Sequence, residues 1–303
     1  MKVRLAFIFL FVSSLFVFSG QISAQDLGPH FKKIKDGIYV YAGRPNDSNC
    51  TIILTQEGVV LIDSGNTPVD SQAVMKAVKQ LTSEPVRFLI NTEPHTDHTT
   101  GHFVFSPPAV IIAAAGAGDS MRQAYNPERM KKMMAEPGEM GMAAKGYHMI
   151  TPHIEYQQKM NLSLGERSFE LYYLKNVHSE ADTAIWLPKE RVLFTAASVG
   201  VKRFNNLRPS VSIPDTLNAI KMMKALNPEV VIPGHGDPGT IKILDDMESY
   251  YNSLLEKVGQ MVKQGKSLDE IKKELRVPGT EDWEGKDRYS NNIEAAYRAV
   301  KGS

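Results

Sequence analysis

The chain has 303 residues, of which 42% are hydrophobic and 23% are charged, and its formal net charge is +1. This length and composition are typical of a globular protein with a sizeable core, in one large domain or two small ones. The balanced charge and the lack of a basic run in the sequence argue against nucleic acid as a partner. A single cysteine, Cys50, excludes an internal disulfide, and its apolar neighbours indicate a buried structural thiol rather than a metal ligand.

Residues 1–24 are predicted to be a secretory signal peptide. Lys2 and Arg4 make a basic start, Leu5 to Phe18 are apolar apart from two serines, and Ile22-Ser23-Ala24 supplies a small-residue cleavage site. The apolar stretch is shorter than the roughly 20 residues that a membrane-spanning helix needs, so an uncleaved anchor is the weaker alternative. We therefore expect a periplasmic or secreted mature chain that starts near Gln25 and does not contact the membrane.

The first half of the mature chain is predicted to be a series of strands followed by a helix. The expected strands, rich in β-branched and aromatic residues, cover 37–42, 50–54, 59–63, 88–91 and 110–113. Thr67-Pro68 opens a helix that runs to Leu81, with apolar side chains at helical spacing.

The second half repeats this pattern. Strands are expected at 169–174, 184–187, 192–195 and 230–232, and a helix from Pro214 to Leu226. Two similar halves of strands and helices predict an α+β fold, a four-layer αβ/βα sandwich within residues 25–240.

Two segments fall outside this sandwich. Residues 119–165 are rich in methionine and are predicted to be a helical insertion, which either packs on the sandwich or covers a substrate. Residues 241–303 are predicted to be a helical extension, with helices at 244–262, 267–275 and 292–300. Ser267, with Glu270 three residues later, gives the second of these helices a capping box.

A cluster of metal-binding side chains directly follows the strand 88–91. The segment Glu93-Pro94-His95-Thr96-Asp97-His98 carries four of them in six residues. In an extended segment residues i and i+2 face the same way, so Glu93 and His95 can bind one ion. A turn into a helix at Asp97 directs Asp97 and His98 toward a neighbouring point, which suits a two-metal centre.

Two further histidines stand where an apolar strand ends and a turn begins. His178 lies in the segment 177–183, and His235 lies in Pro233-Gly234-His235-Gly236. Together with the first cluster, these segments resemble the metallo-β-lactamase superfamily, whose motifs are H-x-H-x-D-H, a turn similar to 178–182, and P-G-H-G. The resemblance covers residues 37–236, and Asp63 fits the strand and turn that precede the metal-binding motif.

The resemblance implies a ligand set and a chemistry. One zinc ion would take Glu93, His95 and His178, and the other would take Asp97, His98 and His235. Three protein ligands per ion leave positions open for water and a small-molecule substrate, as in catalytic zinc sites. Asp97 is the expected catalytic residue, because it both binds metal and orients the attacking water.

The sequence departs from the family pattern at two places. Glu93 replaces the usual histidine, and its negative charge also suits harder ions such as Mn²⁺ or Fe. Ala196-Ala197-Ser198 stands where many members, among them glyoxalase-like thioesterases, carry a metal-bridging aspartate. This absence argues against the thioesterase, phosphodiesterase and flavo-diiron branches, and leaves the β-lactamase branches.

We therefore expect an exported zinc-dependent hydrolase that cleaves a lactam or a related cyclic amide or ester. An unrelated ester or lactone as substrate, or a metal-binding scaffold with little turnover, are the alternatives. Lys202 and Arg203 are either substrate-binding residues that pair with a carboxylate or solvated surface charges. His102, one helical turn after His98, is either a partner of a ligand or a surface residue.

Export is the first testable prediction. Because residues 1–24 combine a basic start, a short apolar stretch and a small-residue end, protein recovered from the cell envelope should begin near Gln25. Amino-terminal sequencing or intact mass measurement checks this, and an amino terminus at Met1 would contradict it.

Overall fold

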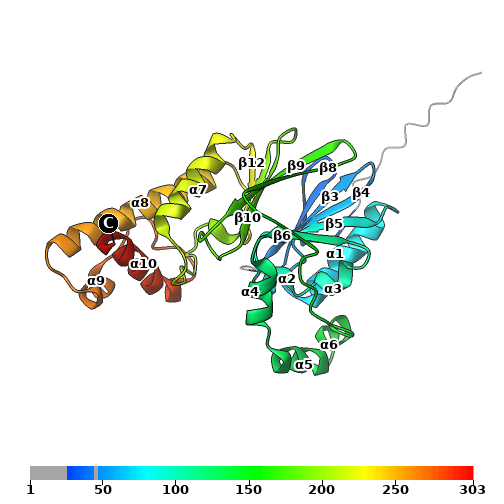
Figure 1. Cartoon of the computed structure of the whole chain (residues 1–303), viewed down its shortest axis with the longest axis horizontal. Helices are drawn as coiled ribbons and strands as arrows, with labels where there is room; N and C mark the ends of the chain where they lie inside the picture. Colours follow the sequence, from blue (N-terminus) through cyan, green and yellow to red (C-terminus); the bar gives the residue numbers. More distant parts are fainter. Residues whose placement is uncertain (1–25, 44–46, 303) are drawn as a thin grey trace, which may run out of the picture.

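The computed structural model describes residues 26–43 and 47–302, so the predicted signal peptide lies outside the described residues. Figure 1 shows two sheets in the middle of an elongated molecule, with helices on their outer faces. The larger sheet has seven strands in the order β1 to β7, and the smaller has five in the order β12-β11-β10-β9-β8.

The larger sheet contains the strands of the first half of the chain. They are β1 (Phe31–Lys35), β2 (Ile38–Ala42), β3 (Asn49–Thr55), β4 (Gly58–Ile62), β5 (Val86–Ile90), β6 (Val110–Ala114) and β7 (Ile154–Tyr156). The smaller sheet contains β8 (Lys159–Leu164), β9 (Arg167–Leu174), β10 (Asp182–Leu187), β11 (Val192–Phe194) and β12 (Val230–Ile232).

Each sheet has apolar side chains on both faces, so one face packs against the other sheet and the opposite face packs against helices. In β3, Cys50 and Ile52 face one way and pack with Val74 of helix α1 (Pro68–Leu81), while Ile53 faces the other sheet. Successive side chains of a strand point to opposite faces, so a strand with apolar residues at neighbouring positions is buried on both faces. Cys50 is fully buried, as a structural thiol should be.

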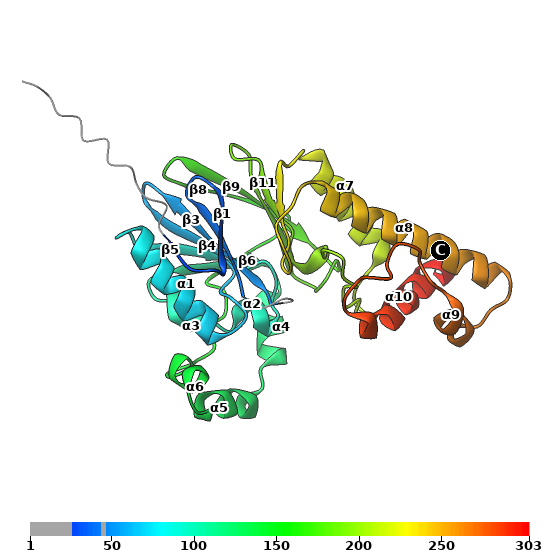
Figure 2. The same ribbon diagram turned by 180° about the vertical axis from the view of Figure 1, so that it is seen from behind.

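The smaller sheet has the same construction. Ile185 of β10 packs into the layer between the sheets, and Trp186 packs outward in a core shared with helices α7 (Ile213–Ala225) and α8 (Lys242–Lys263). Helix, sheet, sheet and helix therefore form four layers, seen from behind in Figure 2. The predicted αβ/βα sandwich is confirmed.

Helix α1 begins where the sequence predicts. The Thr67 hydroxyl accepts a hydrogen bond from the Asp70 backbone N–H, the Asp70 carboxylate accepts one from the Thr67 N–H, and Pro68 occupies the first turn. This reciprocal cap satisfies backbone donors that a helix start leaves unpaired.

The segment 119–165 differs from the predicted helical insertion. It is helical only in α4 (Ala117–Ala124), α5 (Pro127–Ala135) and α6 (Glu139–Ala143), while residues 154–156 and 159–164 form β7 and β8. In β8, Met160, Leu162 and Leu164 alternate with polar residues and pack into the layer between the sheets. This period of two is the signal of a half-buried strand, which outweighs the methionine content.

The carboxy-terminal residues are part of the second helical layer. Helices α9 (Leu268–Glu274) and α10 (Tyr289–Lys301) share one core with α7, α8 and the smaller sheet, through residues such as Ile271 and Ile293. Ser267 and Glu270 form the predicted capping box of α9. Within residues 26–43 and 47–302, no helix is long and apolar enough to cross a membrane.

Candidate metal centre

Three loops at one edge of the two sheets carry the predicted ligands. The first leaves β5 and enters the short helix α2 (Thr96–Thr99), which His95 precedes as its N-cap residue. The second, with His178, joins β9 to β10, and the third, with His235, follows β12. The structure brings all six expected side chains together from these loops.

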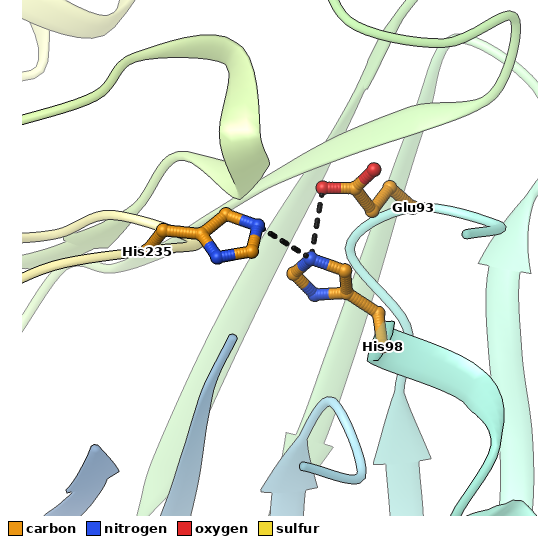
Figure 3. A group of neighbouring side chains, drawn as sticks. All are labelled: Glu93, His98 and His235. Carbon is orange, nitrogen blue, oxygen red and sulfur yellow. Dashed lines mark hydrogen bonds and ion pairs between the residues drawn. The ribbon is translucent and has the colours of Figure 1, made fainter. Parts of the chain in front are cut away.

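The Glu93 carboxylate lies in the middle of the group. It is 1% exposed, and its Oε2 is in contact with His95 Nδ1 and 3.2 Å from His178 Nε2. Its Oε1 is 3.1 Å from His98 Nε2, on the side where His235 also lies, as Figure 3 shows. Two sets of potential ligands result, Glu93 with His95 and His178, and Glu93 with His98 and His235, each with its ligand atoms within 4.8 Å of one another.

This grouping differs from the one that the resemblance implies. Glu93 takes part in both sets, whereas the family pattern assigns it to one ion. Asp97 Oδ2 lies 3.4 Å from His235 Nε2 and 3.7 Å from His98 Nε2, beside the second set. The Asp97 side chain is 36% exposed, so this carboxylate is open to solvent while Glu93 is enclosed.

Asp63 fixes the orientation of His98. Its Oδ2 accepts a hydrogen bond from His98 Nδ1 at 2.8 Å, and its other contacts come from Asn91 Nδ2, the Thr92 backbone N–H and the Thr92 hydroxyl. With the Nδ1 proton committed to Asp63, Nε2 of His98 faces Glu93 and His235, and it can bind a metal ion once it has lost its own proton. A carboxylate behind a histidine is the usual support of a metal ligand.

Charge and burial in the cluster shift its pKa values strongly. Burial lowers the pKa of His98, but the carboxylates of Glu93, Asp63 and Asp97 outweigh it and raise that pKa to about 10. Burial would raise the pKa of Glu93, yet His178 and His98 hold it well below its usual range. Without metal, the centre therefore keeps Glu93 ionised and a proton on His98, which a bound cation has to displace.

The donor set fits divalent zinc. His98 Nε2 and His235 Nε2 face each other at 3.4 Å. Imidazole nitrogens and carboxylate oxygens, three to a group, are the ligands of catalytic zinc. The negative charge of a buried carboxylate needs positive charge beside it. A metal cation that both the carboxylate and the imidazoles bind supplies that charge.

Glu93 also reaches the loop that lacks the bridging aspartate. The Ala197 backbone N–H donates a hydrogen bond to Glu93 Oε1 at 3.3 Å. Gly234 closes this loop against the His235 turn, since a Cβ atom there would lie 2.7 Å from Ala196 C and Ala197 N. A carboxylate from the first motif therefore occupies the space beside Ala197.

Strand β3 holds the His235 turn in place. Asn49 Nδ2 donates hydrogen bonds to the carbonyls of Pro233 and Gly236, at 2.9 Å and 2.8 Å, and the Asn49 N–H donates to Gly234. The Ser48 hydroxyl donates to the Asp97 carbonyl. From the sequence, Ser48 and Asn49 are predicted only to end a turn and begin a strand. No short-range pattern predicts that Asn49 contacts residues about 185 positions later in the chain.

The two predicted substrate-binding residues, Lys202 and Arg203, have different surroundings. Lys202 pairs with Asp282 at 2.6 Å, with its side chain 69% exposed, as a solvated surface charge would. Arg203 is 9% exposed and lines a cavity of about 230 Å³ together with His95, Asp97, His178 and His235. Arg208 and Arg288 line the same cavity and have no motif that could have revealed them.

His102 is not a surface residue, and its Nδ1 hydrogen bond goes to the backbone and not to a metal-ligand candidate. It is 1% exposed, and its Nδ1 donates to the Ile150 carbonyl at 2.8 Å. Burial lowers the pKa of His102 to about 4, so the ring is neutral and belongs to the packing behind α2.

Comparisons with known proteins agree with this fold. The sequence model of the metallo-β-lactamase superfamily matches residues 43–235, which is more than half of the chain. The chain belongs to this superfamily, whose members are metal-dependent hydrolases.

Individual relatives are distant. A type 2 metallo-β-lactamase from Bacteroides fragilis is 27% identical over 37% of this chain and 47% of its own length. The alpha subunit of a 2,4-dinitroanisole O-demethylase from Nocardioides sp. is 23% identical over 59% of this chain and 49% of its own. The chain thus spans about half the length of these curated relatives.

Solved structures share the fold. A sec-alkylsulfatase from Pseudomonas sp. matches with a TM-score of 0.71 and 18% identity, over 88% of this chain and 49% of its own. A metallo-β-lactamase from Pontibacter korlensis matches with a TM-score of 0.58 and 19% identity, over 73% of this chain and 98% of its own.

The position of Glu93 between the two sets generates a prediction about metal content. Glu93→Gln should lose both ions, because one neutral amide replaces the carboxylate that both sets share, whereas His178→Ala should lose one ion and keep the other. Elemental analysis of zinc-dialysed wild-type protein and both variants measures this.

Circular dichroism of the same samples controls for folding. A Glu93→Gln variant that retains one ion per chain, as His178→Ala does, would show that Glu93 serves a single ion.

Proposed function

We propose that the protein is an exported zinc-dependent hydrolase that opens a lactam or a related cyclic amide or ester. The observation that carries the proposal is the convergence of two sets of potential ligands on Glu93, beside a cavity of about 230 Å³ that His95, His178 and His235 line. Zinc is favoured over harder ions because four of the six ligand candidates are imidazoles.

The residues around the ions have separate tasks. Bound zinc would supply Lewis-acid polarisation of the scissile group and activation of water at neutral pH. Asp97 Oδ2 faces the cavity beside His235 and is the group that orients the attacking water and accepts its proton. Burial would raise the pKa of Asp97, but His98, His235 and His95 lower it, which keeps this carboxylate ionised and able to accept a proton.

Support for a lactam comes from the relatives in Bacteroides fragilis and Bacillus cereus, both named type 2 metallo-β-lactamases. A lactone or an unrelated ester is the alternative within the same chemistry. A sulfate ester is a second candidate, because the match to the sec-alkylsulfatase extends over 88% of the chain and the cavity contains three arginines.

Export is part of the proposal and rests on the basic, apolar and small-residue pattern of residues 1–24. A periplasmic or extracellular enzyme of this kind would act on a small molecule that reaches the cell from outside.

Turnover of one substrate class tests the function. Zinc-loaded protein should hydrolyse at least one of a chromogenic cephalosporin, a γ-lactone, an aryl ester and an alkyl sulfate. Asp97→Asn should reduce that turnover by a factor of about 100 or more, since removal of a positioned general base costs roughly this much.

Asn replaces the carboxylate with a group of the same size, so the fold of Asp97→Asn should match the wild type, and its turnover is compared at saturating zinc because Asp97 is also a ligand candidate. Lys257→Gln, on helix α8, is the surface control. Turnover by Asp97→Asn above a few percent of wild type at saturating zinc, or no turnover of any substrate by the wild type, contradicts the proposal.

A further inference from the structure

We propose that Arg203, Arg208 and Arg288 form an anion-binding subsite, which holds a carboxylate or sulfate group of the substrate next to its scissile bond. The three guanidinium groups line the cavity that also contains His95 and Asp97. This inference rests on the proposed function, whose substrate it narrows to anionic molecules.

The guanidinium groups have unused donors. Arg203 is 9% exposed, and the Nη1 atoms of Arg203 and Arg208 are buried without a hydrogen-bond partner. Among residues 26–43 and 47–302, no carboxylate lies within 4 Å of the charged nitrogens of these three arginines. Guanidinium groups are always charged, so buried ones without a counter-ion are unfavourable.

Arg167 shows how this fold ordinarily accommodates a buried arginine. Arg167 is 8% exposed, and its Nη1 is 2.6 Å from Glu190. Its Nε and Nη2 donate to the carbonyls of Leu54 and Asp36. Arg203 is equally buried, but among the described residues no carboxylate lies within 4 Å of its guanidinium group, so we expect a bound anion to be its partner.

The charge balance inside the cavity favours an anion. Burial and the nearby charge of Arg288 lower the pKa of Arg203, although the carboxylates of Asp97, Glu284 and Glu93 act in the opposite direction. Asp97 is the one acidic residue that lines the cavity, and it is already engaged with His98 and His235. A bound anion would offset the mutual repulsion of the guanidinium groups and accept their free donors.

The carboxy-terminal extension builds this subsite. The backbone of Glu284 pairs with that of Lys202 and Phe204, with N···O distances of 2.9 Å and 3.0 Å, which fixes the segment that carries Arg203. Asn292 Nδ2 donates to the Asn205 carbonyl at 2.7 Å, and Arg288 stands directly before α10. The extension therefore contributes to substrate recognition as well as to the core.

The size of the cavity limits what the subsite can hold. About 230 Å³ is smaller than the roughly 300–1,000 Å³ of pockets that enclose a drug-sized ligand. An anionic group between the arginines must then lie close to the bond that reacts beside His95 and His178. Arginine donors match the paired oxygens of a carboxylate or a sulfate, and both groups are candidates.

Equilibrium titration with anions tests the subsite without turnover. Sodium sulfate and sodium acetate are titrated by calorimetry at constant ionic strength into zinc-loaded and chelator-treated protein. Wild-type protein, with or without zinc, should bind sulfate or acetate. Arg288→Gln and Arg208→Gln should each weaken that binding at least tenfold. The anion that binds more tightly separates a sulfate from a carboxylate substrate.

Arg122→Gln is the matched control, because Arg122 is exposed and pairs with Asp119 away from the cavity. It should bind the anions as wild type does. No binding by wild type in either metal state, or equal binding by both cavity variants, overturns the subsite. Loss of zinc or turnover with the anion effect intact would instead count against the proposed function alone.

Discussion

The site depends on the buried negative charge of Glu93. Glu93 is almost fully enclosed and contacts imidazole nitrogens on both of its oxygens. A carboxylate in such surroundings is stable only with positive charge next to it, supplied by protons on histidines or by metal ions. The cluster from three loops, the carboxylate of Asp63 behind His98 and the hydrogen bond from Ala197 are all arranged around this requirement.

The two departures from the family pattern are linked by this geometry. The sequence shows a glutamate where a histidine is usual and, about 100 residues later, no bridging aspartate. In the structure the Glu93 carboxylate lies beside Ala197, at the loop where that aspartate is missing. The second loop thus has no acidic residue at this position, and the carboxylate beside Ala197 comes from the first loop.

Much of this architecture is predictable because its signals are local. Helix α1 has a capping box and helical periodicity, and the buried strands are apolar runs between turns. The ligands are recognisable because three motifs carry them. Other features depend on residues that are far apart in the sequence, so no short pattern predicts them. They are the position of Glu93 between two sets of ligands, the hydrogen bonds from Asn49 to the His235 turn, and the place of Arg208 and Arg288 in the cavity. Strand β8 lies in the methionine-rich segment that is predicted to be helical, although the alternation of apolar and polar residues along it is typical of a strand.

Anomalous diffraction at the zinc edge, from crystals of the zinc-loaded protein, tests the central claim most directly. Two peaks should flank the Glu93 carboxylate, one beside His95 and His178 and the other beside His98 and His235. A single peak, or none, with Glu93 held by protonated histidines alone would contradict the two-ion centre.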